Sequence, residues 1–146
     1  MEQRPISIGI ENYKEIINKE YYYIDKTNFI KELLDKKGKV NVFTRPRRFG
    51  KTLALSMIKT YFEKEIDLQG YVIDNSHYFA GKNILEAGEK YTAHMGEYPV
   101  ISLSLKSAKQ PNFQMAYDSL IDKIMVEYKR HSYILSEQVL TAEDVE

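Results

Sequence analysis

One stretch of this chain, from Thr44 to Leu53, carries residue types that together could hold a phosphate group. It contains Gly50-Lys51-Thr52, the second half of the pattern G-x-x-x-x-G-K-[ST]. In that pattern backbone N–H groups and a lysine hold phosphates, and a hydroxyl ligates Mg²⁺. The first glycine of the pattern would fall at position 45, which is occupied by Arg45. The sequence therefore predicts a phosphate loop whose first half is altered.

The donors of this loop follow its proline. Pro46 has no N–H group, so the backbone amides that could point at a phosphate begin after it. Lys51 would reach the outer phosphates as a mobile charge and is the candidate catalytic residue. Thr52 would place its hydroxyl on Mg²⁺. The predicted nucleotide contacts are Arg47, Arg48, Phe49, Gly50, Lys51, Thr52 and Leu53.

The arginines of the loop leave alternatives open. Because a residue before proline is driven to extended geometry, Arg45 would continue a strand and the turn would start later. Arg45, Arg47 and Arg48 could pair phosphate oxygens bidentately, or grip acidic groups elsewhere on the protein. The Gly-Lys-Thr sequence could also begin a helix by chance. Contact of the arginines with a nucleic-acid backbone is a further alternative, but a tight loop beside a buried strand exposes little surface for a duplex.

Hydrophobic periodicity predicts the elements that would position the loop. Residues 40–43 form a short apolar run that predicts a buried strand before the loop. Apolar residues from Leu53 to Phe62 recur at helical spacing after it. Residues 100–105 alternate and predict a second strand, and the helical patterns are at 11–20, 29–34 and 113–128. We therefore expect an α/β fold, P-loop NTPase-like, with a mainly parallel sheet flanked by helices.

Composition bounds the class of protein. The chain has 146 residues, with 21 Lys and Arg against 21 Asp and Glu. A net charge of zero argues against direct nucleic-acid binding by this part. There is no cysteine, which fits a reducing cytoplasm, and no apolar run reaches the roughly 20 residues of a membrane span. We expect a cytoplasmic protein with no membrane partner.

Three landmarks in order resemble a known family. Tyr22-Tyr23-Ile24-Asp25-Lys26-Thr27 comes first, the loop from Thr44 to Leu53 second, and Tyr98-Pro99-Val100-Ile101 third. This order resembles the AAA-ATPase-like family of bacterial and archaeal proteins, in which arginine at position 45 is the norm. The resemblance implies ATP and Mg²⁺ as ligands and a P-loop ATPase core, often joined to a C-terminal nuclease-like domain of the PD-(D/E)XK type. It gives no role to Lys26, and we interpret Asp25 as a helix cap.

The acidic residues that a P-loop ATPase needs are missing from the pattern. Such an enzyme holds Mg²⁺ with an acid at the end of an apolar strand. Asp74 follows Val72-Ile73, but we interpret it as a turn residue, and the resemblance places the acidic strand further downstream. His77, His94 and His131 lack metal-ligand spacing.

We therefore expect residues 1–146 to be the N-terminal portion of a longer ATPase, with a helical segment at 1–38 and the start of the core at 39–146. This portion would bind ATP and Mg²⁺ but not act alone, because hydrolysis would need the residues that follow. An incomplete sheet would expose an edge through which copies could associate. The alternative function is a non-catalytic module that binds an anion or an acidic partner through the same loop.

Overall fold

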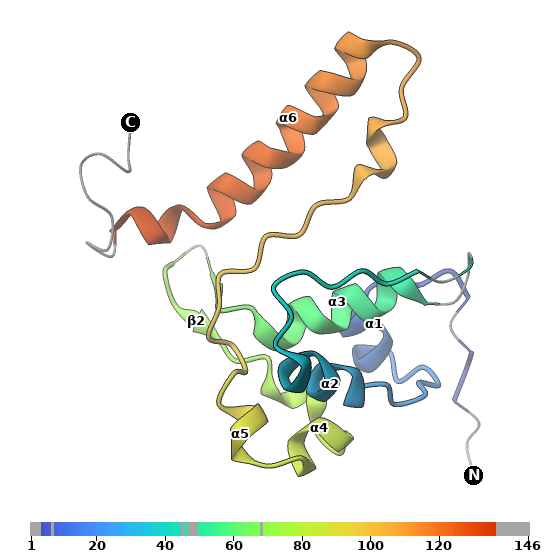
Figure 1. Cartoon of the computed structure of the whole chain (residues 1–146), viewed down its shortest axis with the longest axis vertical. Coiled ribbons are helices and arrows are strands. Elements are labelled where there is room, and N and C mark those ends of the chain that lie inside the picture. The colour runs from blue at the N-terminus through green and yellow to red at the C-terminus, as the bar shows by residue number, and fades with distance from the viewer. Residues whose placement is uncertain (1–3, 7, 45, 47–49, 68, 137–146) are drawn as a thin grey trace. The chain divides into compact units, whose positions relative to one another are not determined.

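The computed structural model describes residues 4–6, 8–44, 46, 50–67 and 69–136, in two compact units. The first unit comprises Met1–Glu65 and Asp74–Tyr98, and the second comprises Ile66–Ile73 and Pro99–Glu146. The helices of the first unit are α1 (Tyr13–Asn18), α2 (Asn28–Lys36), α3 (Lys51–Phe62), η1 (Ser76–Phe79), α4 (Asn83–Glu86) and α5 (Glu89–Thr92), shown in Figure 1. The second unit contains η2 (Leu105–Ala108), α6 (Phe113–Arg130) and η3 (Ser132–Ser136).

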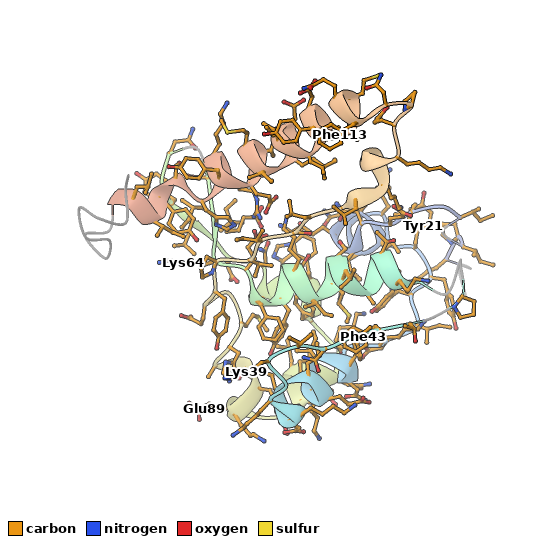
Figure 2. The ribbon with its side chains drawn as sticks, turned by 45° about the horizontal axis from the view of Figure 1, so that its top comes forward. Tyr21, Lys39, Phe43, Lys64, Glu89 and Phe113 are labelled. Atoms are coloured by element: carbon orange, nitrogen blue, oxygen red, sulfur yellow. The ribbon has the colours of Figure 1, made fainter. Side chains whose placement is uncertain are left out.

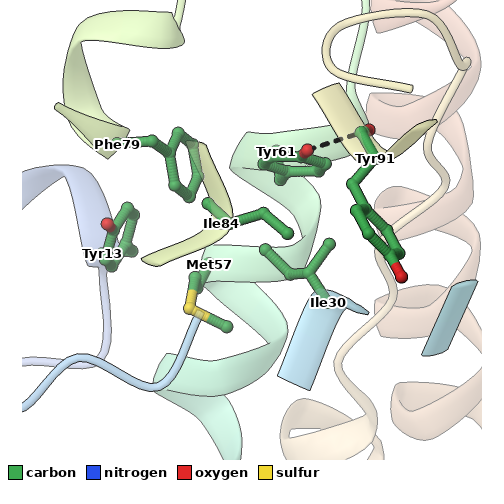
Figure 3. Close-up of a cluster of buried hydrophobic side chains, with 7 residues drawn as sticks. All are labelled: Tyr13, Ile30, Met57, Tyr61, Phe79, Ile84 and Tyr91. Carbon is green, nitrogen blue, oxygen red and sulfur yellow. Dashed lines mark hydrogen bonds between the residues drawn. The ribbon is translucent and has the colours of Figure 1, made fainter. Parts of the chain in front are cut away.

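The first unit contains the hydrophobic core. Its centre is shown in Figure 3, where side chains from α1, α2, α3, η1, α4 and α5 converge. The buried cluster consists of Tyr13, Ile30, Met57, Tyr61, Phe79, Ile84 and Tyr91. Its aromatic rings pack in the offset or edge-to-face arrangements that ring quadrupoles favour. Tyr61, for example, meets Phe79 edge-on at 5.1 Å.

Tyr13 joins α1 to the rest of this unit. Its backbone N–H donates to the Ser56 hydroxyl of α3 at 3.0 Å, and its own hydroxyl donates to the Tyr78 carbonyl at 3.0 Å. Burial raises the pKa of the Tyr13 hydroxyl well above its ordinary value. The Tyr61 hydroxyl makes a similar bond to the Tyr91 carbonyl at 3.0 Å (Figure 3). Both rings are therefore buried with their polar atoms satisfied, as buried tyrosines require.

Helix α2 ends within the Lys36-Lys37-Gly38 run, with Lys37 as its C-cap. The Lys36-Lys37-Gly38 run predicts glycine just past the last turn. In the structure Lys37 takes the left-handed conformation, with φ 48°, and its N–H donates to the Leu33 carbonyl at 3.3 Å. Gly38 is instead approached by the Asn41 amide, which donates to its carbonyl at 3.0 Å.

The two predicted strands are not strands in the structure. Residues 40–43 and 100–104 have no strand pairing, and Leu105 begins η2. The expected mainly parallel sheet is thus not seen among the described residues. Their sheet consists of β1 (Glu65–Ile66) and β2 (Val72–Ile73), which are antiparallel. A strand exists only with a neighbour that accepts and donates its backbone hydrogen bonds, and these apolar runs find none in the described chain.

Isolated bridges provide the remaining β pairing. Ile6 pairs with Tyr22, and Glu63 with Tyr98, both in parallel. The Tyr22 N–H donates to the Pro5 carbonyl at 2.9 Å. This fits the extended segment that the sequence predicts at residues 21–24, although it is a single bridge and not a full strand.

The second unit is built on α6, which Asn112 caps by accepting from the Met115 N–H at 2.9 Å. Helix α6 packs on η2. At its other end the Arg130 guanidinium and the His131 ring both contact the Val100 carbonyl, at 2.7 and 3.0 Å. Through these two contacts, the C-terminal end of α6 holds the segment that precedes η2.

The apolar stripe predicted along α6 is present but exposed. No residue of α6 is fully buried, and Phe113 is 80% exposed on the first turn (Figure 2). Amphipathic periodicity thus identified the helix correctly, but no part of the described chain buries its apolar side. None of the described helices combines the length and the apolar character needed to cross a bilayer.

Candidate phosphate-binding site

The site predicted from sequence lies at the start of α3. Gly50 caps this helix with φ 73°, a left-handed conformation that glycine adopts without strain. The Ala54 N–H donates to the Gly50 carbonyl at 2.9 Å, so the first turn is regular. The backbone N–H groups of a first helical turn have no partner within the helix and point out of its N-terminus, where the helix dipole favours an anion.

Lys51 and Thr52 follow directly, on the first turn of α3. The Lys51 amine donates to the Pro46 carbonyl at 3.0 Å, so its side chain folds back over the loop. Thr52 is exposed. Both side chains are therefore at the loop, where a phosphate and its cation would lie.

The other predicted contacts divide into two groups. Leu53 packs against the hydrophobic core, so only its backbone could serve a ligand. Arg45, Arg47, Arg48 and Phe49 lie outside the described residues. Their part in the site stays a prediction.

The Asp25-Lys26-Thr27 turn links α2 to α4. The Asp25 carboxylate accepts from the Thr27 N–H and from the Asn83 N–H, both at 2.8 Å. The Thr27 hydroxyl, fully buried, accepts from the Ile84 N–H at 3.2 Å. Asp25 is thus a cap, as predicted, but the helix that it caps is α4, 58 residues away in sequence.

The electrostatics of Asp25 follow from these bonds. Partial burial pushes the pKa of this carboxyl upward, but the hydrogen bonds from Asn83 and Thr27 outweigh it and hold the pKa below its ordinary value. Hydrogen bonds to a charged form favour that form. Asp25 is therefore held as a carboxylate that fixes the turn.

Lys26 points from this turn toward the start of α3. A Cβ built on Gly50 would have the Lys26 amine as its nearest neighbour, at 4.0 Å. Both residues line a cavity of about 170 Å³ within the first unit. The structure thus brings a second lysine, besides Lys51, to the start of α3.

A comparison with known families gives a match. The family described as "Predicted AAA-ATPase" matches residues 7–144. The chain belongs to the AAA-ATPase-like family. The resemblance drawn from the three sequence landmarks is therefore confirmed.

Two further comparisons add little to this membership. The chain is 38% identical over 63 residues to an uncharacterised protein encoded 5′ of vnfD in Azotobacter chroococcum, a match that covers 42% of the chain and 12% of that relative. This AAA-ATPase-like chain thus spans only a small part of the relative's length. No solved structure matches it.

The remaining predicted residues have structural roles. Asp74 follows β2 and accepts from the N–H and the hydroxyl of Ser76, at 2.8 and 2.9 Å. These bonds lower the pKa of the Asp74 carboxyl, as expected for a turn residue. The His77 ring contacts the Asp74 carbonyl at 3.2 Å, and His94 contacts the Tyr98 hydroxyl. Within the described ranges, no three His, Asp or Glu side chains form a group that could hold a metal ion.

Sequence reasoning missed the position of Lys26. The Tyr22–Thr27 landmark was recognised, but a lysine between a cap and a buried threonine carries no local pattern that indicates a ligand. Only the fold brings residues 26 and 50 together, because the turn between α1 and α2 packs beside α3.

Proposed function

We propose that this chain binds Mg-ATP through the loop before α3, as part of a longer P-loop ATPase. The observation that carries the proposal is Gly50, which begins α3 with a positive φ immediately before Lys51 and Thr52. Membership in a family described as predicted ATPases supports ATP as the ligand.

Each residue of the loop has a chemical role in this proposal. Backbone N–H groups at the start of α3 would cradle phosphate oxygens, aided by the helix dipole. The Lys51 amine would leave the Pro46 carbonyl and pair with the outer phosphates, because an ionic partner outcompetes a neutral carbonyl. Thr52 would ligate Mg²⁺ through its hydroxyl, and the bound ion would neutralise charge on the phosphates.

The donor set fits a phosphate and one Mg²⁺ ligand. Added to the loop amides, Lys51 and Thr52 match the grip of a phosphate loop. Hydrolysis would need an acid that positions Mg²⁺ and water, and we place that acid after residue 146. The portion described here would bind nucleotide without turning it over.

The P-loop NTPase-like sheet is part of the same proposal. Val40 and Ile101 are 82% and 70% exposed, although each lies in a run of apolar, strand-forming residues. Such residues stabilise a sheet when they pack between helices. We propose that both runs pair as strands in the longer protein.

Calorimetric titration of the full-length protein with Mg-ATP tests the proposal, with Lys51→Ala beside the wild type. Hydrogen bonds to charged groups contribute about 1.5–3 kcal/mol. Removing the amine should therefore weaken binding roughly 10- to 150-fold. Lys39→Ala, which removes an exposed lysine outside the site, is the matched control and should bind as the wild type does.

Equal affinity of the wild type and Lys51→Ala for Mg-ATP would refute the proposal. Binding of inorganic triphosphate as tightly as ATP would instead favour the anion-binding module, since such a module makes no contact with the nucleobase.

A further inference from the structure

We propose that the cavity beside Gly50 is the nucleobase subsite of this protein, with Lys26 at the side that faces the phosphate loop. This inference rests on the proposed function and locates the part of the ligand that the loop does not hold. Its ligand class is a nucleotide whose heterocyclic base enters the cavity while its phosphates stay at the start of α3.

The size of the cavity limits what it can take. Pockets for drug-sized ligands measure roughly 300–1,000 Å³. This cavity, at about 170 Å³, is too small for a whole nucleotide and suited to a fragment such as one planar base. It is partly open, and all the residues that line it belong to the first unit.

The walls of the cavity have the chemistry of a base site. Tyr22, Ile24, Ala54 and Met57 offer aromatic, aliphatic and thioether surface, and Lys26 adds a cation at one side. Planar bases stack on aromatic rings and fill apolar slots, whereas a free anion would gain nothing from the apolar part of this wall. The wall therefore distinguishes a nucleotide from a simple phosphate.

Tyr22 is the wall residue that is free to stack. Its backbone is fixed by the bridge to Ile6, while its side chain is 59% exposed. Tyr23, the other tyrosine of the wall, is already engaged: its hydroxyl contacts the Met57 sulfur at 3.2 Å and its ring meets Tyr13 edge-on at 5.3 Å. Tyr23 thus shapes the cavity, and Tyr22 is the ring that a base would cover.

Gly50 connects the cavity to the phosphate loop. It lines the cavity and is also the cap of α3. A base and its phosphates are joined by one sugar, so a base site must open directly onto the phosphate site. The shared glycine satisfies this condition, and among the described residues the Lys26 amine is the atom that a Cβ at this position would meet, at 4.0 Å.

The turn that carries Lys26 is held on both sides. Asp25 is bound to Asn83 and Thr27 to Ile84, so the backbone at residue 26 cannot shift without breaking two hydrogen bonds, of which the second is buried. Lys26 itself is exposed. A fixed backbone with a mobile ammonium suits contact with a ribose-proximal phosphate.

The test compares two ligands, ATP and inorganic triphosphate, on the full-length protein by calorimetry with Mg²⁺ present. Two variants alter the cavity and leave the loop intact: Ala54→Leu fills it from α3, and Tyr22→Ala removes the stacking ring. Both should weaken ATP binding and leave triphosphate binding within twofold of the wild type. For Tyr22→Ala the loss should be roughly 5- to 150-fold, the range of base–aromatic stacking.

Matched controls separate the subsite from general damage. Tyr71→Ala removes an exposed tyrosine of the second unit and should change neither affinity. Lys26→Gln should weaken binding of both ligands, because it removes charge near the phosphates, while Lys39→Gln should weaken neither. If Ala54→Leu does not fold, Tyr22→Ala alone decides, since its side chain is largely exposed.

The outcomes are distinct. Selective loss of ATP affinity in Tyr22→Ala supports the subsite. Unchanged ATP affinity in this variant, or an equal loss for both ligands, overturns the subsite while the phosphate loop stands. A wild-type protein that binds neither ligand overturns the proposed function as well.

Discussion

At the scale of single residues, the side chains of the Asp25-Lys26-Thr27 turn go to two different places. The first and third side chains accept hydrogen bonds from the backbone at the start of α4. The middle side chain points to Gly50. Two side chains of this family landmark thus hold the start of α4 by hydrogen bonds, and its lysine is directed at the candidate site.

Removal of the Asp25 carboxylate should destabilise the first unit. Asp25→Ala leaves the part-buried N–H of Thr27 and the N–H of Asn83 without their acceptor. An unsatisfied group of this kind costs about 1–3 kcal/mol. Urea unfolding followed by circular dichroism should show that loss, whereas Asp122→Ala on exposed α6 should unfold as the wild type does. If Asp25→Ala unfolded at the same urea concentration as the wild type, the Asp25 hydrogen bonds would not stabilise this unit.

The same carboxyl predicts a pH dependence. Because the folded pKa of Asp25 lies below its ordinary value, its stabilising contribution is present above the unfolded pKa of about 3.9 and is lost as pH falls through the folded pKa. The stability difference between the wild type and Asp25→Asn should therefore be constant from pH 7 to 5 and shrink below pH 4. Urea titrations at pH 6.5, 5 and 3 measure it. A gap that widens in acid would show that the sign is wrong.

At the scale of elements, α2 ends with strain that a glycine would remove. Lys37 has φ 48° at the C-cap, where a side chain is crowded against the backbone. The left-handed region costs an L-residue about 1–2 kcal/mol, while glycine loses about 0.5–1 kcal/mol through added freedom in the unfolded chain. The two effects leave a net gain for glycine at this position.

Lys37→Gly should accordingly raise the free energy of unfolding by up to about 1.5 kcal/mol, the difference of those two terms. Thermal or urea unfolding detects such a change. The control is Lys39→Gly, at a position without a positive φ, which should lower stability because only the entropy cost remains. Equal shifts in the two variants would mean that the cap is not strained.

At the scale of the molecule, burial is unevenly shared between the two units. The fully buried apolar side chains of the described residues all belong to the first unit, and α6 has none. Most helical stability in proteins comes from packing of an apolar face and not from propensity. The two units should therefore differ in local stability even though α6 is the longer helix.

Hydrogen exchange measures this difference. Amides in α3, which carries the buried Met57 and Tyr61, should be protected at least about tenfold more than those in α6, since opening α6 exposes little buried surface. Helix length is the built-in control, because α6 has 18 residues and α3 has 12. If length determined protection, the amides of α6 would be the better protected. Protection of α6 equal to that of α3 would contradict the prediction.

Local patterns predicted the elements better than they predicted pairing. The apolar periods identified α1, α3 and α6, because this signal acts within a few residues. The strands at 40–43 and 100–105 were not found, since a strand depends on a partner that the local pattern does not name.

The sequence by itself determined that Gly50-Lys51-Thr52 opens an amphipathic helix, and three landmarks in order indicate the family. Tertiary structure decided what lies beside that loop. It alone set Asp25 to cap α4, placed Lys26 near Gly50 and formed the cavity that Tyr22 lines. The physical reason is that capping and periodicity act over one helical turn, whereas these contacts join segments 24 to 58 residues apart, which only the packing of the core brings together.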